Sequence, residues 1–331
     1  MTEKADLKLF SDNARVAFIG DSITHTSPIT SYIQEYYREH LPKKRVKIFN
    51  LGTGGDTAEG TLERFEADVM RARPTEAVIM LGTNDIKYAL YREHPTSEQL
   101  AEAADRRARH LAAMKQLVER LCALGIPVTL CSSIGRDELT PPRDTPADPG
   151  LRSYGATEVL ATLFAENCRA LSGMLKHTVD YLTPFQTLQG EILAMDGPSL
   201  FTPDRIHASP LGQRIMARLF LAAQGLPVAI PTAAALTAGW QESPLSPVIA
   251  ERFATEQVLR NIRWVDPHQA SETEGLDLDG RIAYWTRAIE EGRGLAQHEW
   301  AVSLYRVYLE NARQEEEIVS RLEAQTEALY Q

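Results

Sequence analysis

One serine of this chain lies where a nucleophile would be well placed. The motif Gly20-Asp21-Ser22-Ile23-Thr24 follows the apolar run Val16–Ile19, so Ser22 comes where a buried strand ends and the chain turns toward a helix. At the carboxyl end of a parallel strand a hydroxyl projects into the crevice where open α/β sheets bind ligands, and its own amide helps to bind developing negative charge. The same residues also suit an ordinary strand-to-helix turn with an N-cap, so this motif alone leaves both interpretations open.

Two further segments supply hydrogen-bond donors at strand ends. The strand-like run Ile48–Leu51 is followed by Gly52–Gly55, and glycines let backbone N–H groups come close to a substrate oxygen. The apolar run Ala77–Leu81 leads into Gly82-Thr83-Asn84-Asp85, and an asparagine at a strand end can point its amide into the same crevice. Both segments also have a purely structural interpretation, a turn with positive φ for the glycines and a loop-capping Asx turn for Asn84.

A fourth segment places a carboxylate and an imidazole just before a helix. Ser209-Pro210 predicts a helix start, with serine as the N-cap and proline at the first helical position, so Asp204 and His207 lie in the preceding loop. Three residues apart in such a loop, the carboxylate reaches one imidazole nitrogen while the other nitrogen faces a nucleophile. A serine needs this assistance because an unassisted hydroxyl is a weak nucleophile at neutral pH.

The four segments, in this order over residues 16–212, resemble the blocks of the SGNH (GDSL-type) hydrolase family, which is named after a serine, a glycine, an asparagine and a histidine. The resemblance implies that Ser22 is the nucleophile, His207 the general base and Asp204 its orienting acid. Ile23 stands where the name-giving motif has leucine, a volume-conserving change that leaves the chemistry intact.

The resemblance also implies an oxyanion hole. Its donors would be the backbone amides of Ser22 and Gly55 and the side chain of Asn84. Gly55 is preferred over Gly52 and Gly54 because the glycine of the family typically stands directly before Asp-Thr, as Gly55 does here.

Alternation of strands and helices predicts an α/β fold with a mostly parallel five-stranded sheet covered on both faces, the three-layer flavodoxin-like arrangement of SGNH hydrolases. In the strand order 2-1-3-4-5, strands one and three flank the topological switch point, so Ser22 and Asn84 would bracket the ligand crevice. The predicted strands are Val16–Ile19, Val46–Phe49, Ala77–Leu81, Ile126–Cys131 and Thr178–Leu182, with helices such as Ser31–Glu39 and Ala101–Leu124 between them.

An apolar helix predicted over residues 213–224 ends at Gly225-Leu226-Pro227. We therefore expect a catalytic domain over residues 1–226 and a helical C-terminal extension over residues 227–331. The extension would begin with a linker or surface segment up to Ser246. Helical patterns follow at Val248–Val265, Asp277–Glu291 and about Leu295 to Tyr330.

The last helix carries an apolar stripe interrupted by polar residues such as Glu315 and Gln325, which fits packing on its own domain or a short dimer contact better than a sustained coiled coil. We therefore expect a homodimer or higher homo-oligomer that forms through the C-terminal helices, which could also shape the mouth of the site. The proline-rich loop over residues 132–151 fits a wall of the active site and an inert surface excursion equally well.

Composition limits the partners. The formal net charge of −10 argues against a nucleic-acid partner, and the chain of 331 residues has no apolar segment that could cross a bilayer. The N-terminus has no hydrophobic h-region, which favours a cytoplasmic location. Neither a phosphate-cradling motif nor a ligand cluster is present, so no metal or organic cofactor is implied.

Together these features predict a serine ester hydrolase that works through an acyl-enzyme on a small-molecule ester. The resemblance favours an acetyl or other short acyl group on a carbohydrate or similar small alcohol, because the family includes many such deacetylases. Two alternatives stay open. One is a lipase, lysophospholipase or thioesterase with the same machinery, and the other is a catalytically silent module for binding or assembly.

Overall fold

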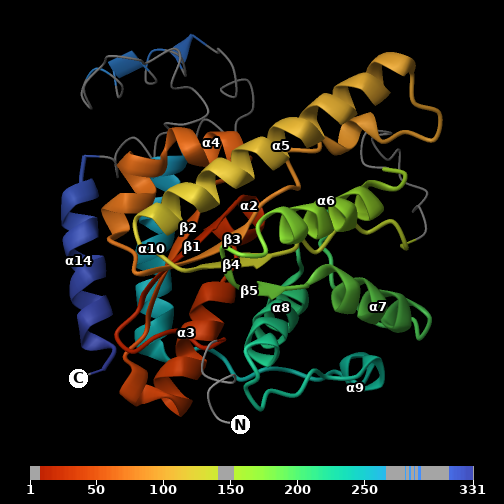
Figure 1. Cartoon of the computed structure of the whole chain (residues 1–331). Helices are drawn as coiled ribbons and strands as arrows, with labels where there is room; N and C mark the ends of the chain where they lie inside the picture. The colour runs from red at the N-terminus through yellow and green to blue at the C-terminus, as the bar shows by residue number, and fades with distance from the viewer. Residues whose placement is uncertain are drawn as a thin grey trace. The chain divides into compact units, whose positions relative to one another are not determined.

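The computed structural model describes residues 8–140, 153–265 and 313–330, together with residues 280, 283, 284, 287, 290 and 291. The chain divides into two compact units, Met1–Leu245 and Ser246–Gln331, and each is described by itself (Figure 1).

The first unit is built on a five-stranded parallel sheet in the order β2-β1-β3-β4-β5, which confirms the predicted topology. At the carboxyl end of β1, Gly20 is in register with Gly52 of β2 on one side and with Met80 of β3 on the other. The strands are β1 (Arg15–Gly20), β2 (Lys47–Gly52), β3 (Glu76–Met80), β4 (Val128–Cys131) and β5 (Leu175–Val179).

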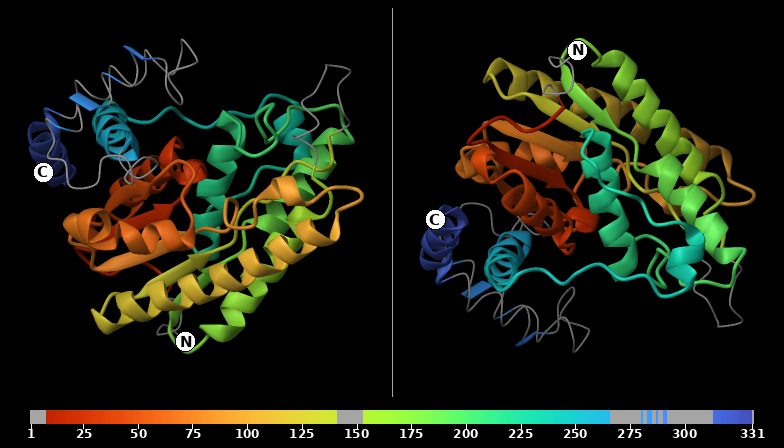
Figure 2. Two further views of the ribbon diagram at one scale, coloured as in Figure 1. Left: turned by 90° about the horizontal axis from the view of Figure 1, so that it is seen from above. Right: turned by 90° about the horizontal axis from the view of Figure 1, so that it is seen from below.

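Helices cover both faces of the sheet, and Figure 2 shows the two layers from opposite sides. The helices α3, α7 and α8 pack on one face, and α4, α5 and α6 pack on the other. The helices of the first unit are α2 (Ser22–His25), α3 (Ile29–His40), α4 (Ala58–Glu63), α5 (Ser97–Ala123), α6 (Ala156–Ala170), α7 (Leu182–Leu193), α8 (Pro210–Ala223) and α9 (Ala233–Thr237).

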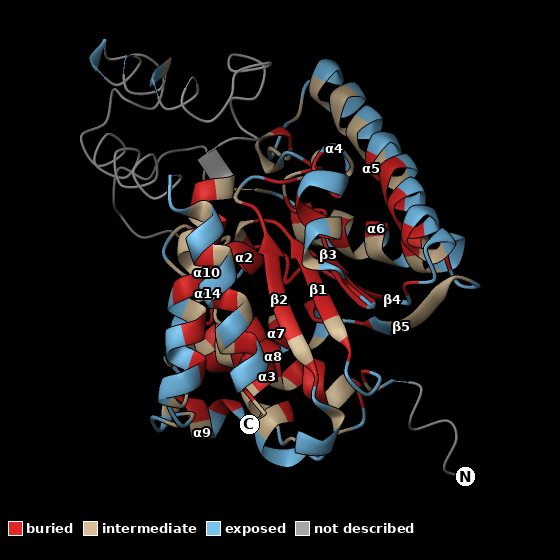
Figure 3. Cartoon of the chain, turned by 90° about the vertical axis from the view of Figure 1, so that its left-hand side faces the viewer, coloured by how far each residue is buried: buried red, intermediate tan, exposed pale blue. Residues whose placement is uncertain are grey.

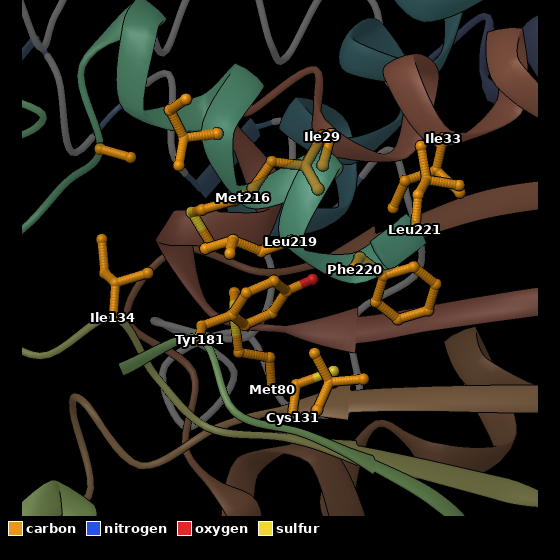
Figure 4. Packing of buried hydrophobic residues seen from close by; sticks show 14 of the residues in the cluster. Ile29, Ile33, Met80, Cys131, Ile134, Tyr181, Met216, Leu219, Phe220 and Leu221 are labelled. Atoms are coloured by element: carbon orange, nitrogen blue, oxygen red, sulfur yellow. The ribbon is translucent and has the colours of Figure 1, made fainter. Parts of the chain in front are cut away.

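The core consists of one apolar layer on each side of the sheet. Ile33 of α3 and Phe220 of α8 belong to the same buried cluster as Met80 and Cys131 from the sheet, and the close view of this layer labels all four (Figure 4). The strands β1 to β4 are buried almost throughout, whereas the helices expose their outer faces (Figure 3). Burial on both faces is why these strands appear in the sequence as continuous apolar runs.

The edge strand differs from its prediction. We expect a strand at Thr178–Leu182, but β5 spans Leu175–Val179 and α7 begins at Leu182. The backbone amides of Tyr181 and Leu182 donate to the Ser132 hydroxyl at 2.8 and 2.9 Å rather than to a strand partner. Because β5 pairs with β4 alone and is mostly half-buried, it lacks the apolar run that marks the inner strands.

The first unit extends beyond the predicted boundary at residue 226. The short helix α9 buries Ala233 and Leu236 in the same core as α3 and α8, and Trp240 packs against this core. The segment that the sequence suggests as a linker or surface wrap therefore runs along the first unit as far as Leu245.

In the second unit, α10 (Pro247–Val265) packs against α14 (Glu315–Ala328). The buried apolar contact is made by Leu259, Ile262, Ile318 and Leu322. The two polar residues of the predicted stripe have partners across this contact. Arg263 Nε donates to Glu315 Oε1 at 2.9 Å, and Gln325 Nε2 donates to Glu251 Oε1 at 3.1 Å.

The predicted start of the last helix at Leu295 lies outside the described residues, as does most of the predicted helix Asp277–Glu291. Within the part of the chain that the structure describes, no helix has the length and apolarity needed to span a membrane.

Candidate active site

Ser22 occupies the turn between the central strand β1 and α2. Asp21 is the N-cap of α2, and its carboxylate accepts a hydrogen bond from the Ile23 amide at 2.9 Å. Ser22 is thus the first helical residue, and its own N–H has no acceptor within the helix. A hydroxyl and an amide of the same residue therefore lie together at the carboxyl edge of the sheet, as the sequence motif predicts.

The Asp204–His207 loop is held in shape by the Asp204 carboxylate. One oxygen, Oδ1, accepts hydrogen bonds from the backbone amides of Ile206 at 2.8 Å and His207 at 3.0 Å, and from the Thr202 hydroxyl at 2.7 Å. The loop then ends at Ser209, which caps α8 by accepting from the Gly212 amide at 3.2 Å. The predicted helix start is confirmed, and the loop before it leaves the second oxygen of Asp204 available to the imidazole.

The structure joins the three predicted triad residues in one hydrogen-bonded chain. His207 Nδ1 lies 2.7 Å from Asp204 Oδ2, and His207 Nε2 lies 2.8 Å from Ser22 Oγ. Asp204 accepts the hydrogen at Nδ1, so Nε2 faces the serine with its lone pair. An imidazole held in this tautomer can take the proton of the hydroxyl.

The environment shifts both members of the acid–base pair. The hydrogen bond to Asp204 raises the pKa of His207, although partial burial acts in the opposite direction. Burial alone would raise the pKa of Asp204, but the hydrogen bonds from the His207 ring and from the two backbone amides outweigh it and hold this pKa well below its usual range. Asp204 is therefore an anion at neutral pH that stabilises a protonated His207.

The Asn84 side chain is bonded to the loop that contains Gly55. Asn84 Nδ2 donates to the backbone carbonyl of Asp56 at 2.9 Å, directly after Gly55. The amide group of Asn84 has a second N–H, which this bond leaves for another acceptor. Because β1 lies between β2 and β3, the Ser22 turn stands between the strands that lead to Gly55 and to Asn84.

The glycines of the loop after β2 have different roles. A side chain at Gly52 would come within 2.8 Å of the His25 Cα atom, so Gly52 allows the strand end to approach α2. Gly54 donates its N–H to His25 Nδ1 at 3.1 Å. Gly55 has φ of 79°, and among the described residues its N–H has no acceptor. This arrangement fits the preference for Gly55 as the amide donor.

Asp56 anchors that loop through a buried ionic cluster that the sequence prediction missed. Its carboxylate accepts from Arg64 Nε and from the Thr61 hydroxyl, each at 2.8 Å. Arg64 also donates to Asp68 at 2.6 Å and to the Leu51 carbonyl at 2.9 Å. The signal was present as an arginine and an aspartate four residues apart in a helical segment, at a spacing that allows an ion pair.

Asp21 is a second ionisable group of the site that the sequence prediction did not single out. Its side chain is only 1% exposed. Burial, together with the negative charges of Asp85 and Asp56, raises its pKa from 3.8 to about 7, although the hydrogen bond from Ile23 lowers it in part. A carboxyl group next to the serine thus changes its charge near neutral pH.

The described part of the 132–151 loop, residues 132–140, is buried at its start and contacts the Asp204–His207 loop. The Asp137 amide donates to the Arg205 carbonyl at 3.0 Å, and Arg205 Nη1 donates to the Thr140 carbonyl at 2.8 Å. The rest of this predicted loop, from residue 141 on, lies outside the described residues. Among the residues that the structure describes, no group of three or more His, Cys, Asp or Glu side chains is placed to hold a metal ion.

A family model for the GDSL-like Lipase/Acylhydrolase family matches residues 18–215, which is more than half of the chain. The chain belongs to this family. It is a carboxylic ester hydrolase. The matched span contains the serine, glycine, asparagine and histidine segments from which the resemblance was inferred.

Individual relatives agree with the family. An acetylxylan esterase of Geobacillus stearothermophilus is 25% identical over 226 residues, which cover 62% of this chain and 92% of that protein. The structure of a gut microbial diltiazem-metabolizing enzyme superposes with a TM-score of 0.75 at 15% identity and covers 97% of this chain and 95% of its own. At this identity the likeness concerns the fold alone.

Proposed function

We propose that the protein is a serine hydrolase that transfers the acyl group of a small ester to Ser22 and then to water. Ser22 is the nucleophile, His207 the general base and Asp204 the residue that orients and stabilises the imidazole. The single observation that carries this proposal is the continuous hydrogen-bonded chain from Ser22 Oγ through both ring nitrogens of His207 to the Asp204 carboxylate.

In the first step, Ser22 Oγ attacks the ester carbonyl carbon while His207 Nε2 takes the hydroxyl proton. The tetrahedral intermediate collapses as the bond to the alcohol oxygen breaks, and His207 gives its proton to the departing alcohol. Water then attacks the acyl-enzyme, its proton passes to His207, and the acid leaves as Ser22 Oγ recovers a proton. No other reactant is needed.

The negative charge on the tetrahedral oxygen would be met by three donors, the backbone amides of Ser22 and Gly55 and the Asn84 side chain. Support comes from the helix-start position of Ser22 and from the bond between Asn84 and the carbonyl that follows Gly55. Donors fixed in advance by the fold stabilise developing charge without reorganising during the reaction.

We propose an acetyl or other short acyl group on a carbohydrate or similar small alcohol as the substrate. The relative that is described as an acetylxylan esterase, matched over nearly its full length, supports this class. A panel of acetylated sugars, aryl esters of graded chain length and acyl thioesters tests it. Rates that increase with acyl length, or that are highest on thioesters, would contradict the short-chain ester and favour a lipase or a thioesterase.

The mechanism is tested by labelling with an organophosphonate and by the Ser22→Ala variant. We expect label on Ser22 alone and loss of nearly all ester hydrolysis, with the folded state kept. Ser97→Ala is a matched control, because Ser97 is also the first residue of a helix but lies at the exposed start of α5. Label on a different serine, or full activity of Ser22→Ala, would refute the proposal.

A further inference from the structure

Arg136 is a buried arginine at the carboxyl end of the sheet that the proposed mechanism does not use. It follows β4 by five residues, and its side chain is only 1% exposed. The guanidinium carbon lies 3.8 Å from the centroid of the Tyr88 ring, which is close enough for a cation–π contact. Because burying a charge is costly, an arginine in such a place needs compensation by its surroundings.

The backbone at Arg136 is held from two helices. Its amide donates to the Thr157 hydroxyl of α6 at 3.1 Å, and its carbonyl accepts from Gln186 Nε2 of α7 at 3.0 Å. The side chain thus starts from a fixed point and lies against Tyr88, four residues after Asn84. Arg136 therefore connects the end of β4 with the segment that carries Asn84.

The segment that contains Arg136 is also bonded to the Asp204–His207 loop. Asp137 and Arg205 exchange two hydrogen bonds, from the Asp137 amide to the Arg205 carbonyl at 3.0 Å and from Arg205 Nη1 to the Asp137 carbonyl at 3.3 Å. Arg205 immediately follows Asp204 and has φ of 64°, a conformation that neighbouring contacts must stabilise. Residues 136 and 137 thus link the Asn84 segment to the loop that holds His207.

The charges around this link come from several elements. Tyr88, Glu138, Asp204 and Arg205 act on the Arg136 guanidinium, while Asp204, Asp21 and Arg136 act on the His207 ring. Burial lowers the pKa of Arg136, but a guanidinium stays charged at any working pH. The positive charge of Arg136 opposes the protonation of His207, whereas the two carboxylates favour it.

We propose that Arg136 is a positioning residue that fixes the Asn84 segment relative to the Asp204–His207 loop and places a permanent positive charge on the segment that is hydrogen-bonded to this loop. This inference rests on the proposed function, because it assigns Arg136 a part in the action of His207. This role does not require Arg136 to contact the ester.

The charge role and the positioning role of Arg136 can be distinguished by how kcat/KM depends on pH. On the acidic side kcat/KM rises as His207 loses its proton, and this rise is the acidic limb of the profile. In Arg136→Met the positive charge is lost, so His207 binds its proton more tightly and the acidic limb moves to higher pH. We expect a move of about half a pH unit, the size of one charge–charge interaction across a partly solvated site. Arg136→Lys keeps the charge but loses the planar stack on Tyr88, so its limb should stay in place while kcat falls by about tenfold through misplacement.

The experiment measures kcat and KM separately across a pH series on an aryl acetate, with circular dichroism as a test of folding. The proteins compared are the wild type, Arg136→Met, Arg136→Gln, Arg136→Lys and Tyr88→Leu. Arg15→Met is the matched control, because Arg15 lies over the Phe49 ring at 4.4 Å near the opposite end of the sheet. We expect the same upward move of the limb in both neutral variants and none in Arg15→Met. Tyr88→Leu should lower kcat and leave the limb unchanged.

An acidic limb that stays at its wild-type position in the neutral variants, or that moves as far in Arg136→Lys, would overturn the proposal. If neither neutral variant folds, Tyr88→Leu decides: unchanged kcat would overturn the positioning role, and a reduced kcat with an unchanged limb supports it. A wild-type chain that hydrolyses no ester, or whose kcat/KM has no acidic limb, refutes the proposed function instead. The two failures are therefore distinguishable.

Discussion

The Asp21→Asn variant should become more stable than the wild type, by an increasing margin, as the pH rises. The substitution removes the charge but keeps an oxygen that can accept the Ile23 amide, now at 2.9 Å, so the cap of α2 is retained. The wild-type carboxyl is 1% exposed and titrates at about 7 in the folded chain, against 3.8 for an ordinary aspartate. Only the folded state holds the proton between these two values, so the free energy of unfolding decreases as pH rises through this window.

The size of the effect follows from the width of that window. Each pH unit over which only one state holds the proton changes the free energy of unfolding by about 1.4 kcal/mol, so a window of about three units gives about 4 kcal/mol. The Asp21→Asn variant has no carboxyl group at this position, so its free energy of unfolding does not undergo this decrease. Its stability relative to the wild type should be constant below about pH 4 and should increase by about 4 kcal/mol by about pH 8.

Urea unfolding of both proteins at a series of pH values measures this difference. Asp12→Asn is the control, because the Asp12 carboxylate is 72% exposed in its ion pair with Lys44, and exposed pairs contribute little. A difference between Asp21→Asn and the wild type that does not change with pH would show that the pKa of Asp21 is the same in the folded and unfolded chain. The physical reasoning about its burial would then be wrong.

Three further predictions concern the site and the assembly. Asn84→Ala should lower kcat by about a hundredfold with little change in KM, because the lost donor acts on transition-state charge; an effect on KM alone would make Asn84 a substrate-binding residue. The hydrogen bond from His207 to Asp204 raises the pKa of His207, so kcat/KM should increase with pH through an apparent pKa above about 6.5; a flat profile from acid to neutral pH would count against this base. Light scattering should find a homodimer or larger assembly, and truncation after Leu245, which keeps α9 in the first unit, a smaller species; a full-length monomer at micromolar concentration would refute contact through the C-terminal helices.

The features that could be predicted from sequence are those that local rules determine. Inner strands buried on both faces leave apolar runs, and their carboxyl ends meet at one edge of a parallel sheet. Short motifs that follow such runs must therefore come to the same edge, as those of Ser22 and Asn84 do after the paired strands β1 and β3. The Asp204–His207 loop follows no strand, and only the family resemblance indicated that His207 would lie against Ser22, as it does at 2.8 Å. The N-cap of α8 followed from the pair Ser209-Pro210 alone, because the cap bond is local.

The features that were missed depend on partners distant in sequence. The edge strand β5 has one neighbour and a half-buried surface, so no apolar run marks it. Arg136 is one charged residue in a polar loop, and nothing in the sequence indicates that its side chain is buried against Tyr88. Glu315 interrupts an apolar stripe in the sequence, yet it pairs with Arg263 on α10. In each case a tertiary contact decides what the residue does.

The loops of the site are also connected to one another by hydrogen bonds. Asn84 is bonded to the carbonyl of Asp56, and the Thr83 and Ser133 hydroxyls, both buried, lie 2.8 Å apart. Arg205 is bonded in turn to the segment that begins at Ser133. The segments after β2, β3 and β4 and the Asp204–His207 loop thus form one connected set in which each position depends on its neighbours. Substitutions within this set should therefore reduce kcat through lost alignment, even where the substituted side chain touches no substrate.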